Sequence, residues 1–287
     1  MADRVKVGNA EIAMVWDAEY RYAPSQFMPS MPREKWQTLL GGSDPDEIIE
    51  SRVMSYLIRS QGKNILVDAG VGLHGFWRFG DGHLLDSLKE LDVTPEDIDF
   101  VAPTHLHGDH VGWFTTPTPD GPVPTFPNAK YLIQKADWDH FIGDDPNSWV
   151  SNPAPNQRMH AAAVVPLKDT GLLDLVGPEQ IITDGVTILH TPGHTVGSVS
   201  VLVQDGSEAA LLVGDALHNP AQLTEPDFSP AVDIDPSLSA RSRRAILEQA
   251  QKANAYVAGG HFGAPGHPAF GRVLLMDGRP MWQGVSL

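Results

Sequence analysis

The sequence contains no cysteine among its 287 residues. Disulfide bonds are therefore excluded, and any metal site has to be built from histidine and carboxylate side chains. Basic residues are also scarce, because 20 lysines and arginines stand against 36 aspartates and glutamates, which gives a formal net charge of −16. Such a surface repels phosphate groups, so we expect neither a nucleic-acid partner nor binding to an anionic membrane.

Other features that mark membrane, secreted or modular proteins are missing as well. No apolar run approaches the length of a membrane span, and the N-terminus lacks the basic start and apolar run of a secretory signal. No linker rich in glycine or serine and no short repeat interrupts the chain. We therefore expect a cytoplasmic protein whose residues 1–287 form a single domain. Residues 1–50 are rich in aromatic residues and methionine, and we expect this N-terminal extension to cap a pocket or to join the contact of a homodimer.

Short apolar runs and helical patterns alternate along the rest of the chain. The runs predict buried strands at 53–58, 64–67, 99–102, 130–134, 185–189, 199–203, 209–213 and 255–258. Helical patterns lie between them, most clearly at 235–253, and the basic run RSRR within that helix is expected on its solvated face. Strand hairpins with interposed helices indicate an α/β fold of two mixed sheets covered by helices on the outside.

The strongest chemical signal is the segment THLHGDH at residues 104–110. It offers three imidazoles and one carboxylate directly after a predicted strand, where a loop can turn its side chains toward one point. Gly108 permits unusual backbone angles within this loop. A surface loop that is merely rich in histidine is the alternative, but the close spacing of four potential ligands favours a metal site.

This His-x-His-x-Asp-His pattern resembles the signature of the metallo-β-lactamase superfamily. Further elements of that family are matched in order by Asp68 at an upstream strand end, the loop TPGHT at 191–195, Gly214-Asp215 and Gly260-His261. The resemblance extends over about residues 53–262. It implies a four-layer αββα sandwich with the site at one edge, between the two sheets.

The resemblance also implies two divalent metal ions held by seven side chains. The ligands fall into two sets with a shared bridge: His105, His107 and His194 for one metal, Asp109, His110 and His261 for the other, and Asp215 between them. This donor set suits zinc first, and also iron, cobalt or manganese. Asp68 is expected to orient a ligand instead of binding metal, and the alternative is an aspartate that only forms the turn at its strand end.

Two neighbouring metals can hold a bridging hydroxide, because a bound metal lowers the pKa of water to roughly 7. We expect that hydroxide to attack the substrate, and we assign catalytic roles to Asp109 and His218. His218 stands three residues after Asp215, where acyl-homoserine-lactone lactonases of this family have a tyrosine that assists the substrate. We expect it to donate a hydrogen bond to the oxyanion or to protonate the leaving group. The alternative is a histidine that only supports a ligand.

Differences among the branches of the superfamily narrow the expected substrate. His107 stands where flavodiiron-type members have glutamate, which disfavours oxygen reduction. True β-lactamases generally lack the aspartate found here as Asp215, and the acidic surface disfavours the tRNA-processing members. The arrangement Gly-Asp-x-x-His around Asp215, with its later Gly-Gly-His, resembles the methyl parathion hydrolase and lactonase branch.

The resemblance therefore implies a metal-dependent hydrolase that cleaves a lactone or a related carboxylic ester. A thioesterase similar to glyoxalase II is an alternative, although that group holds glutathione with basic residues that are few here. A phosphotriesterase is another. A binding protein without activity is the alternative of a different class, and the complete ligand set disfavours it.

Aromatic residues around the motif suggest an apolar pocket, which would suit such a small-molecule substrate. Trp113 and Phe114 follow His110 closely and are expected to touch the substrate. Trp138, Phe141 and Trp149 fall in the segment where this fold usually builds the pocket wall. For each single aromatic residue, ordinary packing in the core is the alternative.

Overall fold

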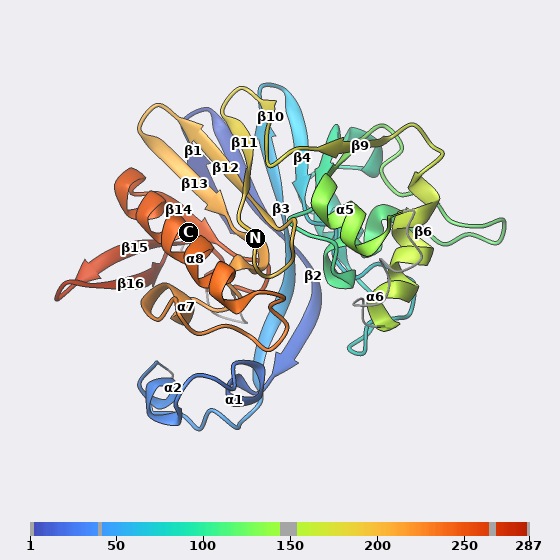
Figure 1. Cartoon of the computed structure of the whole chain (residues 1–287). Helices are drawn as coiled ribbons and strands as arrows, with labels where there is room; N and C mark the ends of the chain where they lie inside the picture. The colour runs from blue at the N-terminus through green and yellow to red at the C-terminus, as the bar shows by residue number, and fades with distance from the viewer. Residues whose placement is uncertain (1–2, 40–41, 144–153, 264–267, 286–287) are drawn as a thin grey trace.

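Two β-sheets lie against each other in the middle of the molecule (Figure 1). The structure, a computed structural model, describes residues 3–39, 42–143, 154–263 and 268–285. Within these ranges the first seven-stranded sheet has the order β1 (Arg4–Val7), β2 (Ala10–Tyr22), β3 (Ile49–Ser60), β4 (Lys63–Val67), β5 (Phe100–Ala102), β8 (Lys130–Gln134), β9 (Leu173–Val176). The second has the order β10 (Glu179–Thr183), β11 (Val186–His190), β12 (Val199–Asp205), β13 (Glu208–Leu212), β14 (Tyr256–Ala258), β15 (Gly271–Met276), β16 (Arg279–Gly284). A small ribbon pairs β6 (Thr115–Thr116) with β7 (Val123–Pro124).

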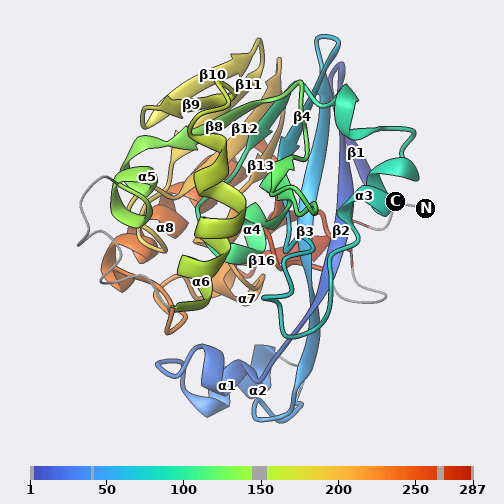
Figure 2. The same ribbon diagram turned by 90° about the vertical axis from the view of Figure 1, so that its right-hand side faces the viewer.

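Helices cover the outer faces of both sheets (Figures 1 and 2). The α-helices are α1 (Pro24–Phe27), α2 (Arg33–Leu39), α3 (Leu84–Lys89), α4 (Gly108–Val111), α5 (Lys135–Phe141), α6 (Ala154–Met159), α7 (Ala221–Thr224) and α8 (Pro236–Ala253). Single turns are η1 (Pro95–Asp97), η2 (Gly112–Phe114), η4 (His160–Val164), η5 (Val165–Leu167) and η6 (Gly214–Ala216). α8 packs on β13 and β15 of the second sheet, whereas α3 packs on β2 and α5 on β8 of the first. The expected αββα sandwich is confirmed.

One apolar core joins the facing surfaces of the two sheets. Val67 of β4 belongs to the same buried cluster as Val201 of β12 and Leu212 of β13. A second cluster fills the space between the first sheet and its helices, where Leu88 of α3 and Phe141 of α5 are buried. Burying one such side chain stabilises the fold by about 1.5–3 kcal/mol, so the two clusters together hold the layers in place.

The strand directions bring the expected site together. In the first sheet β4 and β5 are parallel, so Asp68 and the segment 104–110 leave it at the same edge. In the second sheet β13 and β14 are parallel, and β11 runs in the same direction because two antiparallel pairings separate it from β13. The segments with His194, Asp215 and His261 therefore also leave their sheet at a common edge. In open α/β sheets, ligands bind at the edge formed by the carboxyl ends of the strands.

The N-terminal residues divide between the sheet and the surroundings of the site. β1 and β2 are strands of the first sheet, and β2 pairs with β3 from Glu11 to Tyr22. Only the following segment, with α1 and α2, lies outside the layers at the end of these long strands (Figures 1 and 2). Met28 and Trp36 of this segment are buried against Ala221 of α7. The apolar runs of the sequence do not predict the strand at residues 10–22, and the homodimer contact remains a prediction.

The basic run in α8 differs from the prediction of a solvated face. Arg241 and Arg244 are exposed, but Arg243 is 1% exposed. Its guanidinium group reaches the interior because this side of the helix packs against the loops that precede it. Among the described residues, none of the helices has both the length and the apolar character needed to cross a membrane.

Candidate metal centre

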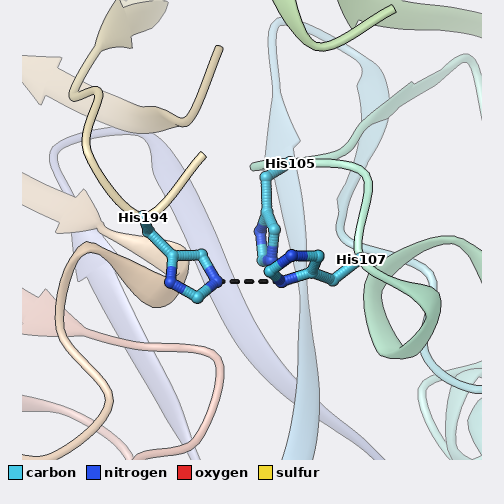
Figure 3. A group of neighbouring side chains, drawn as sticks. All are labelled: His105, His107 and His194. Atoms are coloured by element: carbon cyan, nitrogen blue, oxygen red, sulfur yellow. Dashed lines mark hydrogen bonds between the residues drawn. The ribbon is translucent and has the colours of Figure 1, made fainter. Parts of the chain in front are cut away.

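The first set of expected ligands converges on one point. The facing nitrogen atoms of His105, His107 and His194 all lie within 4.8 Å of one another. Figure 3 shows the three rings directed toward each other, with His105 and His107 on one chain segment and His194 on another. The Nε2 atom of His194 lies 2.9 Å from Nδ1 of His107. Three imidazoles in this arrangement can hold one metal ion.

The second set lies beside the first and shares a carboxylate with it. The ligand atoms of Asp109, His110 and His261 also lie within 4.8 Å of one another. Asp109 Oδ2 is 3.8 Å from Nε2 of His110 and 3.4 Å from Nε2 of His261. Asp215 Oδ2 is 3.5 Å from Nε2 of His194 and 3.3 Å from Nε2 of His261. A carboxylate at this place can contact metal ions in both sets.

Several polar atoms inside this cluster make no hydrogen bond to another described residue. Nε2 of His105, Nε2 of His110 and Oδ1 of Asp215 are buried without a hydrogen bond in the part of the chain that the structure describes. A buried polar atom without a partner costs free energy, and native proteins satisfy almost all such atoms. Imidazole nitrogens and a carboxylate that face one another without donors between them fit divalent metal ions such as zinc.

The protonation of His105, His107 and Asp215 suits metal binding, whereas nearby carboxylates outweigh burial and raise the pKa of His110 and His261. Burial, together with the neighbouring imidazoles, lowers the pKa of both His105 and His107 well below the usual value. Burial alone would raise the pKa of Asp215, but the surrounding histidines hold it well below its usual value. Neutral imidazoles and an ionised carboxylate are the forms that donate electron pairs to a metal.

Outer contacts set the direction of the ligand rings. Nδ1 of His194 lies 2.9 Å from Oδ1 of Asp233, and Nδ1 of His261 lies 3.0 Å from the carbonyl oxygen of Arg52. A proton on Nδ1 that is donated to an acceptor leaves Nε2 with a free lone pair facing the cluster.

Asp68 lies behind His110, where it can orient this ring. Its Oδ2 atom is 3.0 Å from Nδ1 of His110. Its Oδ1 atom accepts hydrogen bonds from the backbone nitrogen and the hydroxyl of Thr104, at 2.7 and 3.0 Å. Asp68 also adopts a left-handed backbone conformation at φ 62°, so it both shapes the end of β4 and contacts a metal-site histidine.

An open pocket of about 670 Å³ leads to the cluster. Its polar lining includes Arg78, Asn156, His107, Asp109, His194, Asp215, His218 and His261. Its apolar lining consists of Tyr20, Phe27, Phe76, Trp77, Phe141, Ala231, Val232 and Ile234. His218 is buried and faces the cluster, since its Nε2 lies 3.0 Å from Oδ2 of Asp215. Its ring also makes a T-shaped contact with Phe27.

The prediction that Trp113 and Phe114 line the pocket is wrong. Both are buried in the core cluster between the first sheet and its helices, where Phe114 packs edge-on against Tyr131. Trp113 donates its indole proton to Asp17 at 2.7 Å, and its ring is buried. The turn η2 that follows α4 directs both rings inward, and proximity to His110 in sequence does not determine that direction. Phe141 does line the pocket, and Trp149 lies outside the described residues.

Two carboxylates near the cluster carry no signal in the sequence. Asp233 contacts His194 across 39 positions of the chain. Asp137 accepts hydrogen bonds from the backbone of Leu106 and Gly197 and from the hydroxyl of Thr195, so it ties the loop of the first histidines to the loop of His194. Because neither residue stands at a fixed spacing from a ligand, only the fold reveals these contacts.

Comparison with known proteins agrees with this geometry. Residues 48–261 match the sequence profile described as the metallo-beta-lactamase superfamily. This match extends over most of the chain and contains all seven expected ligands. The chain therefore belongs to the metallo-beta-lactamase superfamily.

Individual relatives have low sequence identity to this chain. An N-acyl homoserine lactonase from Bacillus sp. is 26% identical over 238 residues, which cover 76% of this chain and 84% of that protein. The solved structure of AbOPH, described as a hydrolase in the beta lactamase superfamily, matches with a TM-score of 0.83 at 22% identity, covering 100% of this chain and 98% of the other. The structure of AidC, described as a dizinc quorum-quenching lactonase in complex with a product, matches with the same TM-score, identity and coverage. At this identity the two structures demonstrate a shared fold.

Proposed function

We propose that this protein is a two-metal hydrolase that opens a lactone or cleaves a related carboxylic ester. The observation that carries the proposal is the cluster of seven donor side chains at the bottom of a largely apolar pocket. Divalent metals held there would acidify a water molecule and polarise a carbonyl oxygen at neutral pH. Zinc is the metal we propose, because the donor set suits it and the structurally similar AidC is described as a dizinc enzyme.

The residues of the chain would hold the metals and act on the substrate in separate roles. His105, His107 and His194 would hold one metal, Asp109, His110 and His261 the other, and Asp215 would contact both. His218 faces the same space from beside Asp215, within reach of a substrate oxygen. We assign it the donation of a hydrogen bond to the developing oxyanion or of a proton to the leaving oxygen.

The pocket favours a substrate with an apolar part. Phe27, Trp77 and Phe141 line its walls, and Val232 and Ile234 expose aliphatic surface at 50% and 46% of their area. Such walls suit an acyl or aryl group, while the lactone or ester carbonyl would face the metals. Lactonase relatives, including the N-acyl homoserine lactonase from Bacillus sp., support a lactone as the first substrate class to test.

The same lining disfavours a thioesterase of the glyoxalase II type. Among the described residues that line the pocket, Arg78 is the one with a permanent positive charge. Recognition of the two glutathione carboxylates by side-chain cations would require more than this single arginine.

A substrate panel tests the proposal. Protein loaded with zinc would be assayed against lactones, aryl esters, thioesters, phosphotriesters and β-lactams. We expect kcat/KM to be far higher for lactones or aryl esters than for β-lactams, and a chelator to abolish the activity. A clear preference for a β-lactam or a thioester would contradict the substrate assignment, and metal-loaded protein that hydrolyses none of the panel would contradict the proposed function.

A further inference from the structure

Behind His194 lies an ion pair that takes no direct part in the ligand set. Oδ1 of Asp233 is 2.9 Å from Nδ1 of His194, and its Oδ2 is 3.3 Å from Nη1 of Arg243. The side chains of Asp233 and Arg243 are both completely shielded from solvent. Desolvation of a buried ion pair can cost more than its attraction returns, so stability alone is a poor explanation for its presence.

The other donors of Arg243 connect it to the chain around the metal centre. Its Nε donates to the carbonyl of Pro226 at 2.7 Å, and its Nη2 donates to the hydroxyl of Ser229 at 2.5 Å. Its Nη1 also reaches the carbonyl of Ala216 at 3.4 Å. Ala216 directly follows Asp215, so one guanidinium group contacts the turn of the shared carboxylate and, through Asp233, the ring of His194.

Backbone contacts fasten the loop of His194 to the same region. The backbone nitrogen atoms of Ile234 and Asp235 donate to the carbonyls of His194 and Gly193, at 3.1 and 2.9 Å. Gly193 has a φ of +134°, and a Cβ atom there would lie 2.1 Å from the backbone nitrogen of Ser239 in α8. The loop can approach α8 this closely because position 193 has no side chain.

We propose that Asp233 and Arg243 are positioning residues of the metal centre. Asp233 accepts the Nδ1 proton of His194, which leaves the Nε2 lone pair directed at the space shared with His105 and His107. Arg243 holds the carboxylate of Asp233 in that orientation and links it to the turn that carries Asp215. The inference rests on the metal site of the proposed function, but it concerns metal affinity and not the identity of the substrate.

Asp233→Asn tests the role with little change of shape. The amide of asparagine has one oxygen that accepts hydrogen bonds and one nitrogen that only donates them. It cannot accept from both His194 and Arg243, so the His194 ring loses its fixed tautomer and direction. We expect affinity for the metal at His105, His107 and His194 to fall about 10- to 100-fold, while the site of Asp109, His110 and His261 keeps its affinity. Titration with Co²⁺ against a competing chelator, followed by the visible absorption of the two sites, measures both values.

Matched variants complete the experiment. Asp227→Asn is the control, because Asp227 pairs with the adjacent Arg244 on the exposed side of α8 and should leave both affinities unchanged. Arg243→Lys keeps the charge but loses the fork of donors, and we expect it to weaken the same site if Asp233→Asn fails to fold. Wild-type affinity in both variants, or an equal loss at both metal sites, would overturn the inference. Wild-type protein that binds no Co²⁺ or Zn²⁺ would instead contradict the proposed function.

Discussion

At the scale of single residues, His218 is the side chain whose role separates substrate chemistry from metal binding. It lines the pocket and contacts Oδ2 of Asp215, yet its geometry with His194 and Asp215 would also permit a metal ligand. If it acts on the substrate, His218→Ala should lower kcat by about tenfold or more with both metals still bound, because a proton or hydrogen-bond donor is lost. Steady-state kinetics combined with elemental analysis of the same sample measures both effects.

Asp215→Ala is the contrasting variant at the neighbouring position. Removing the carboxylate that lies between the two ligand sets should cause loss of bound metal and loss of activity. Full kcat in His218→Ala would exclude the catalytic role. Metal loss in that variant would show that His218 supports the ligands instead.

At the scale of elements, the segment that follows β2 contributes Phe27 to the lining of the pocket. Phe27 of α1 lines the pocket and packs against His218 and Tyr22, while the rest of the segment is anchored by Trp36. Phe27→Ala should raise KM for substrates with a large apolar group by about tenfold or more, since a buried phenyl ring contributes about 1.5–3 kcal/mol. Metal content should remain at the wild-type level.

A matched phenylalanine distinguishes this effect from a general loosening of the segment. Phe228 packs on the same apolar cluster as Phe27, but it is not among the described residues that line the pocket. Phe228→Ala should therefore leave KM unchanged. Equal KM changes in both variants would contradict a direct contact between Phe27 and the substrate.

At the scale of the whole molecule, the metal centre connects the two sheets. The segment 104–110 leaves the first sheet, whereas His194, Asp215 and His261 leave the second. Metal bound to both should stabilise the native state, by about 4 kcal/mol per site when free metal exceeds Kd about 1,000-fold. Chelation should then lower Tm by on the order of 10 °C, and added zinc should restore it. Calorimetry of chelated and reloaded protein gives this difference.

Metal stoichiometry provides an independent check on the same arrangement. Protein purified without chelator should contain close to two metal equivalents per chain, because the ligands form two sets around a shared carboxylate. Fully loaded protein that holds only one equivalent would contradict the two-metal assignment. An unchanged Tm after complete metal removal would contradict the stabilising link between the sheets.

The sequence by itself determined the features that depend on local patterns. The segment 104–110 places four potential ligands within a few residues of one another, and apolar runs mark most of the strands that end at the site. Residues close in sequence lie on the same short loop, so their spacing alone predicts that the ligand side chains of this segment can converge after a strand. The order of the further ligands along the chain then indicated the family, and the family implied the αββα sandwich.

Tertiary structure decided which distant residues complete the site. Asp233 reaches His194 only because the loop before α8 packs on the loop after β11, and Arg243 is buried by the same packing. Phe27 lines the pocket while Trp113, much closer to the ligands in sequence, turns into the core toward Asp17. The direction of a side chain on a short turn and its contacts across the chain depend on how the layers pack, and no local periodicity contains that information.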